Sequence, residues 1–139
     1  MIKLQNILSE ALNKKEIMAI VKKVYPHIAK DLGSRMVPVE VHNNIYKRLD
    51  AVGIEDLMKQ NNPSAQYDWD KKKIYLYSSK MKNSEEIIKS LLHEHTHTLQ
   101  NKDRYFWYYR EKGHNYETHP FEKEAKKAEK KWKRYLKFI

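Results

Sequence analysis

The sequence of 139 residues contains no cysteine, only three glycines and four prolines, and no long apolar run. Without cysteine there are no disulfide bonds or thiolate ligands, so any metal ion would be held by histidine and carboxylate side chains. No stretch approaches the ~20 consecutive apolar residues of a membrane-spanning helix. The N-terminal segment lacks the continuous apolar region of a signal peptide. These absences predict a soluble, unexported protein of the cytoplasm.

The residues that are present fit a folded domain with a basic surface. Hydrophobic residues make up 40% of the chain and aromatic residues 12%, so residues 1–139 are expected to form a single domain. Lys and Arg number 28 against 18 Asp and Glu, which gives a formal net charge of +10. Two interpretations of this excess stay open. One is a Lys-rich surface that maintains solubility, which we favour, and the other is an anionic partner such as nucleic acid.

The N-terminal part, residues 1–60, is predicted to be mostly helical. Apolar residues recur at helical spacing from Ile17 to Leu32, with Pro26 interrupting the period and expected to kink or split the helix. Residues 43–60 are predicted to form short helical pieces.

Two stretches alternate polar and apolar residues and predict strands. Residues 36–41 form the first, and Pro38 favours a place at the edge of the sheet. Residues 65–79 form a hairpin that turns at residues 70–72. Strands and helices together predict an α+β fold with a short antiparallel or mixed sheet.

Residues 84–100 predict an amphipathic helix with three histidines. At about 100° per residue its apolar side chains gather on one face. They are Ile87, Ile88, Leu91, Leu92 and Leu99. His95 lies in the middle of this face and is predicted to be a core histidine whose ring nitrogens are satisfied. His93 and His97 lie together on the opposite face, one turn apart.

His93, Glu94 and His97 form the pattern H-E-x-x-H. Two neutral imidazoles at i and i+4 can bind one Zn²⁺, and the adjacent glutamate can take a proton from a water that the metal activates. The alternative is a polar helix face that carries two histidines and no ligand. The position of the motif, on an amphipathic helix directly after a hairpin, favours zinc, with Glu94 as the general base.

With this motif the chain resembles the zincin metallopeptidases over about residues 65–130. The resemblance implies a zincin-like domain in which a small sheet with an edge hairpin packs on the H-E-x-x-H helix and a C-terminal helix closes the cleft. It also implies a zinc-dependent protease that hydrolyses the bonds of a peptide or protein substrate. In the gluzincin group a Glu on a later helix completes the site. Glu122 and Ala125 match that E-x-x-A pattern, which implies Glu122 as the third metal ligand.

Other candidates for the third ligand stay open. The last helix is expected to begin near Pro120 and to carry one continuous apolar stripe. Glu122 and Glu124 lie on opposite flanks of this stripe, so periodicity does not choose between them.

Three further residues compete with these glutamates. His114 would suit a similarity to the SprT-like proteases, which act on proteins crosslinked to DNA, although Asn115 stands where that family has Gly. Asp103 matches a ligand position of some zincins, but Gln100 replaces the Gly expected there. His119 is predicted to cap a helix or to pack in the interior.

Residues 103–120 are rich in aromatic side chains and are predicted to form a loop. The zincin resemblance implies that one tyrosine, Tyr108, Tyr109 or Tyr116, donates a hydrogen bond to the oxyanion of the reaction. We select Tyr116 because it stands close before the third-ligand helix. The competing interpretation is that the aromatic residues cover the C-terminal helix.

The tail at residues 126–138 is basic and amphipathic. Its apolar stripe favours docking on the domain over calmodulin-like, membrane-surface or nucleic-acid binding. A protein that keeps zinc only for stability, such as a viral or scaffold component, is the remaining alternative. The compact chain resembles small proteins of tailed bacteriophages, which would place it in the host cytoplasm.

Overall fold

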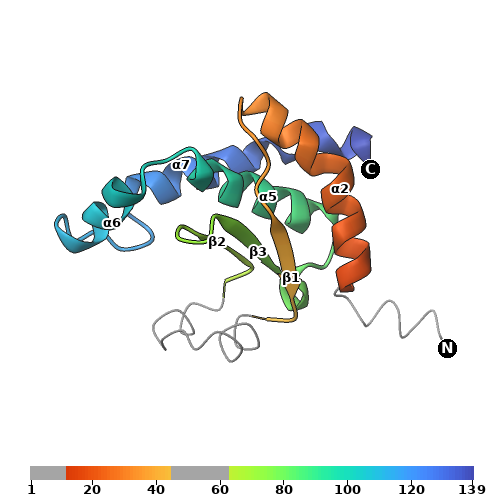
Figure 1. The fold of residues 1–139 in the computed structure, drawn as a ribbon, viewed down its shortest axis with the longest axis horizontal. Coiled ribbons are helices and arrows are strands. Elements are labelled where there is room, and N and C mark those ends of the chain that lie inside the picture. The colour runs from red at the N-terminus through yellow and green to blue at the C-terminus, as the bar shows by residue number, and fades with distance from the viewer. Residues whose placement is uncertain (1–11, 45–62) are drawn as a thin grey trace.

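The structure, a computed structural model, describes residues 12–44 and 63–139 (Figure 1). Its elements are α2 (Lys14–Asp31), β1 (Val39–His42), β2 (Ala65–Asp68), β3 (Lys73–Tyr77), the 3₁₀ turn η1 (Ser78–Lys80), α5 (Ser84–Thr98), α6 (Lys102–Arg110), α7 (Pro120–Ala128) and the 3₁₀ helix η2 (Glu129–Phe138). Helices and a small sheet form one α+β domain, as predicted. The helical pieces predicted for residues 43–60 lie outside the described residues, apart from the first two positions.

The three strands form a mixed sheet in the order β1-β3-β2. β1 runs parallel to β3 and β2 runs antiparallel to it, so the predicted hairpin and the predicted edge strand are confirmed. The first strand begins at Val39 and not at residue 36, because Pro38 has no N–H to donate to the ladder. The hairpin turn is held by the Asp68 carboxylate, which accepts hydrogen bonds from the N–H groups of Asp70 and Lys71.

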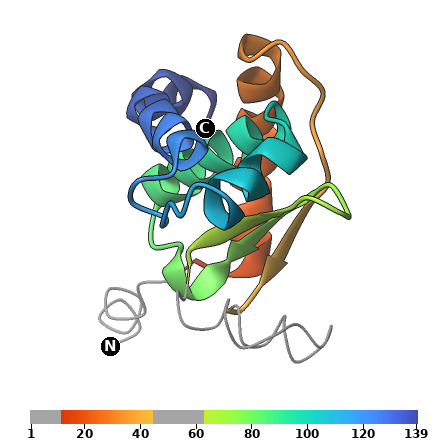
Figure 2. The same ribbon diagram turned by 90° about the vertical axis from the view of Figure 1, so that its left-hand side faces the viewer.

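Helix α5 occupies the centre of the domain (Figures 1 and 2). It packs on β2 and β3 on one side and on α2, α7 and η2 on the others. Asn83 caps its first turn by accepting from the N–H of Glu86. The helix ends at Thr98, so Leu99, which was expected on its apolar face, is the C-cap residue and is 49% exposed.

Helix α2 runs through Pro26 as one element and does not split there. A capping box between Asn13 and Glu16 satisfies the first turn. Its buried residues Ile17, Val21 and Ile28 join those of α5 in the core. In the described part of the chain, no helix combines the length and apolar character needed to cross a bilayer.

The loop predicted for residues 103–120 is wrong for its first half, which is helix α6. Asn101 caps this helix by accepting from the N–H of Arg104. The rings of Tyr105, Tyr108 and Tyr109 surround the buried His119. This aromatic packing, between α6 and the segment that leads into α7, accompanies a helix where a loop was predicted.

Candidate metal centre

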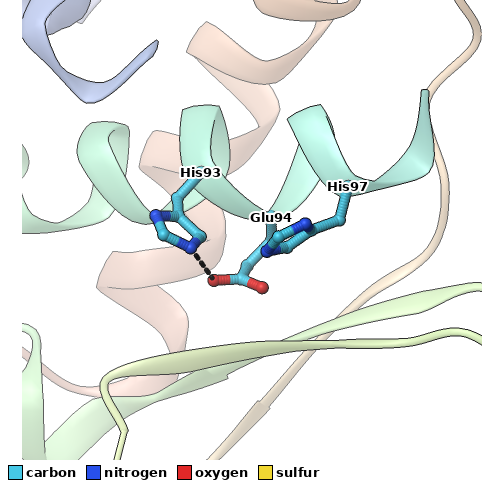
Figure 3. A group of neighbouring side chains, drawn as sticks. All are labelled: His93, Glu94 and His97. Carbon is cyan, nitrogen blue, oxygen red and sulfur yellow. Dashed lines mark ion pairs between the residues drawn. The ribbon is translucent and has the colours of Figure 1, made fainter. Parts of the chain in front are cut away.

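The H-E-x-x-H motif brings three buried side chains together on α5. Donor atoms of His93, Glu94 and His97 all lie within 4.8 Å of one another. Figure 3 shows the two imidazole rings on the same side of the helix, pointing toward the strands, with the Glu94 carboxylate between them. The i, i+4 spacing thus produces the predicted pair of rings, and packing of neighbouring elements buries it.

Glu122 of α7 lies between the two histidines. Its Oε1 atom is 2.9 Å from Nε2 of His93 and 3.1 Å from Nε2 of His97. Its Oε2 atom accepts a hydrogen bond from the hydroxyl of Tyr105. Glu94 is farther away, with its Oε2 atom 4.0 Å from Nε2 of His93. One carboxylate oxygen therefore faces two Nε2 atoms, and a second carboxylate stands beside them.

The other ring nitrogen of each histidine is bound to an acceptor. Nδ1 of His93 is 2.7 Å from the Glu129 carboxylate, and Nδ1 of His97 is 2.7 Å from Oε1 of Gln100. The amide nitrogen of Gln100 donates to the Phe121 carbonyl and to Glu124, so its oxygen must be the atom that faces His97. Both histidines consequently carry a proton on Nδ1 and direct Nε2 at Glu122, the orientation that metal-bound histidines usually adopt.

The charges of this cluster shift the pKa values of its members strongly. Burial alone would lower the pKa of His93, but the carboxylates of Glu94, Glu122 and Glu129 together raise it to about 10. Burial also opposes the raised pKa of His97, which Glu122 and Glu94 produce. Despite burial, hydrogen bonds from the two histidines hold the pKa of Glu122 well below its usual range. The carboxylates around the two rings therefore favour a positive charge at this position.

Geometry and chemistry of the donor set fit a zinc ion. Two donor atoms bound to one tetrahedral zinc at ~2.0–2.1 Å are about 3.3 Å apart. The observed separations of 2.9 and 3.1 Å are within a few tenths of an ångström of this value. Two imidazole nitrogens and one carboxylate oxygen are the ligands of several catalytic zinc sites. His93, His97 and Glu122 could hold the ion, and Glu94 would stand beside it.

Tyr116, the tyrosine selected from the sequence, is 51% exposed. Burial raises the pKa of the Tyr116 hydroxyl, and the charges of Glu122, Glu94 and Glu129 raise it further. Within the described part of the chain, this hydroxyl makes no hydrogen bond. Its role as a hydrogen-bond donor to the oxyanion stays a prediction.

The other candidates for the third ligand lie elsewhere. Glu124 is exposed and bonds Gln100. His114 bonds Thr118 through Nδ1, 3.1 Å away, and its ring packs on Tyr108. Asp103 is exposed in the first turn of α6, where it lines a surface cleft of about 500 Å³.

The prediction that His119 caps or packs is confirmed. Its side chain accepts from the N–H of Phe121 at the start of α7, and its Nε2 atom is 2.7 Å from the Tyr105 carbonyl. The ring is completely buried, which places it in the structural framework around α6 and α7.

Three residues of the centre were not assigned a role from the sequence. Tyr105 supports Glu122, Gln100 supports His97, and Glu129 supports His93. The sequence spacing gives a partial indication of two of these residues. Gln100 follows His97 by about one helical turn, and Glu129 follows Glu122 by about two turns, so each can lie on the same side of its segment as the proposed ligand. The link of Tyr105 to Glu122 joins two separate helices and has no such signal.

The comparisons with known proteins do not assign the chain to a family. No family model matches the sequence, and no curated protein or solved structure matches it. The resemblance to zincins is therefore limited to the H-E-x-x-H motif. The arrangement of the side chains is what indicates a possible metal centre.

Proposed function

We propose that the protein is a zinc-dependent metallopeptidase in which His93, His97 and Glu122 bind the metal. The observation that supports this most is the convergence of two Nε2 atoms and one Glu122 oxygen, at 2.9 and 3.1 Å. A peptide or protein is the proposed substrate, and the cytoplasm the proposed location.

Each residue of the motif has a distinct proposed role. Zinc supplies a Lewis acid that lowers the pKa of water and polarises a carbonyl group. Burial raises the pKa of Glu94, against the opposing influence of His93 and His97, which suits a group that must take up a proton. Glu94 removes the proton from the attacking water and passes it to the leaving amine. Tyr116 donates its hydroxyl proton in a hydrogen bond to the developing oxyanion.

A zinc ion that only stabilises the fold is the second candidate function. The carboxylate of Glu94 lies within 4.8 Å of donor atoms on both histidines and could become a fourth ligand. Four protein ligands close a zinc site, whereas a catalytic site keeps one position open. The position of His114, bonded to Thr118, gives no support to a SprT-like site.

Zinc content distinguishes the ligands. We expect about one Zn²⁺ per chain in the wild type, Glu124→Ala and His114→Ala, and loss of zinc in Glu122→Ala. The measurement is elemental analysis after reconstitution and dialysis. Absence of zinc from the reconstituted wild type would sink the proposal, and loss in His114→Ala alone would identify a different site.

Activity distinguishes the two functions. Glu94→Gln keeps the size of the side chain but cannot accept a proton, so we expect unchanged zinc content and a fall of at least about 100-fold in cleavage of a fluorogenic peptide library. The matched variant Glu124→Gln should cleave like the wild type. If Glu94→Gln instead lowers zinc affinity and the wild type cleaves nothing, the zinc is structural.

A further inference from the structure

The outer face of η2 carries a dense group of positive charges. Five exposed residues form what we call the basic ridge, and they are Lys130, Lys131, Lys133, Arg134 and Lys137. Helix α7, which leads into η2, continues the same excess with the exposed residues Lys126 and Lys127 (Figure 1). The only acidic residue of η2, Glu129, directs its carboxylate inward to His93.

The inner side of η2 holds the ridge in its outward orientation. Residues three apart in a 3₁₀ helix stack above one another, with a rise of about 6 Å per turn. Tyr135 is buried and donates to the Asp31 carboxylate at 2.8 Å, and Phe138 stacks on His27 at 3.5 Å. The ridge residues therefore cannot turn toward the domain unless η2 undocks.

Within the described part of the chain, the charges of the ridge have no carboxylate partners. Other lysines are neutralised, since Lys73 pairs with Glu40 at 2.6 Å and Lys102 with Asp70 at 2.5 Å. Across residues 12–44 and 63–139, by contrast, no ridge side chain has an ion pair within 4.0 Å. Such a concentration of like charge on one fixed surface favours association with a polyanion.

We propose that the basic ridge binds the phosphate backbone of double-stranded DNA. An amphipathic helix that inserts into a membrane or a protein groove needs a free apolar face. Tyr135 is buried here and Trp132 and Phe138 are packed against the core, so Leu136 is the one exposed apolar residue of η2. Single-stranded nucleic acid needs exposed aromatic rings for stacking, and the ridge itself consists of Lys and Arg. The backbone of a duplex presents regularly spaced phosphates on its outer surface, which suits a row of positive point charges.

The dimensions of the ridge set the expected strength of this interaction. The ten residues of η2 extend over about 20 Å, or roughly six base pairs of duplex. Five phosphate contacts would produce a slope of about −4.5 in log affinity against log salt concentration, which is roughly 500-fold between 50 and 200 mM. Contacts to phosphates carry no sequence information, so the binding is expected to be independent of sequence.

Binding to a fluorescent 20-base-pair duplex tests the proposal by anisotropy on the full chain. The ridge variant replaces Lys130, Lys131, Lys133, Arg134 and Lys137 by Gln. The control variant removes the same number of charges elsewhere, by replacing the exposed residues Lys14, Lys15, Lys22, Lys71 and Lys80 by Gln. We expect the ridge variant to bind at least about 100-fold more weakly at 50 mM salt, and the control variant to stay within about 5-fold of the wild type.

Several results would overturn the proposal. These are wild-type binding too weak to measure at 50 mM salt, equal losses in the two variants, and wild-type binding to phosphatidylserine vesicles but not to DNA. Equal thermal unfolding temperatures show that the variants fold. If the ridge variant does not fold, the triple variant Lys131→Gln, Arg134→Gln, Lys137→Gln serves instead, and its salt slope should be less steep by about 2.7. None of these results depends on the proposed peptidase activity.

Discussion

The two sides of α5 place the same residue type in opposite chemical states. His95 is fully buried between the hydroxyls of Tyr25 and Ser34, at 2.7 Å from Nδ1 and 2.6 Å from Nε2. Burial lowers the pKa of His95 to about 4, so the ring is neutral. His93, almost as deeply buried, has a pKa raised to about 10. The difference lies in the neighbours, because hydroxyl groups solvate a neutral ring and carboxylates stabilise a cation.

This comparison shows which buried histidines can bind a metal. The hydroxyl of Tyr25 accepts from the N–H of Val37, which leaves its own proton for Nδ1 of His95. Both nitrogens of His95 are thus engaged by hydroxyls. Among the described residues, Nε2 of His93 and of His97 meets carboxylates, which would remain as ligands or neighbours of a cation.

The largest expected effect is on zinc affinity, when a histidine from each side of α5 is replaced in turn. His97→Ala removes one of three proposed ligands and should weaken zinc binding by at least about 100-fold. His95→Gln keeps an amide that can bond Tyr25 and Ser34, so zinc affinity should stay within about 3-fold. A chromophoric chelator in competition measures both affinities. Strong zinc loss in His95→Gln, with normal binding by His97→Ala, would reverse the assignment.

A second effect follows from protons in the metal-free centre. At pH 6 both His93 and His97 are in the positively charged form with a proton on each ring nitrogen, since the pKa of each is raised above the ordinary 6.5. Zinc must displace these protons, so its binding should release roughly two of them and tighten about 100-fold per pH unit near pH 6. Calorimetry in buffers of different ionisation enthalpy counts the protons. Zinc binding without proton release would contradict the raised pKa values.

A smaller effect is expected from the support of His97. Gln100→Ala removes the acceptor of its Nδ1 proton and the link to the Phe121 carbonyl, and should weaken zinc binding about 10–100-fold. Glu124→Gln keeps an acceptor for Gln100 and serves as the control. Equal zinc affinity in Gln100→Ala and the control would show that Gln100 does not position the ring.

The smallest effect concerns stability on the His95 side. Tyr25→Phe leaves Nδ1 of His95 and the Val37 N–H without a partner, which should lower the free energy of unfolding by about 1–3 kcal/mol. Tyr116→Phe, at a half-exposed position, should leave the free energy of unfolding unchanged. Urea denaturation monitored by circular dichroism measures both. A stable Tyr25→Phe protein with weakened zinc binding would mean that the two sides of α5 are not independent.

Local periodicity carried much of the fold prediction. The alternation within residues 65–79 predicted the hairpin, and the 3.6-residue period of α5 separated His95 from His93 and His97. Helix α6 was missed because its aromatic residues have no clear apolar face, and none of them is buried. Their contacts with His119 depend on a segment that follows the helix, which a local pattern does not contain.

The sequence by itself determined that His93 and His97 share one face of a helix, because i and i+4 are neighbours in every α-helix. Only the tertiary structure placed Glu122, and not Glu124, between their rings. It also decided that Glu129, Gln100 and Tyr105 support the three donors. Periodicity describes the faces of one helix, whereas the meeting of α5 and α7 depends on the packing of the whole domain.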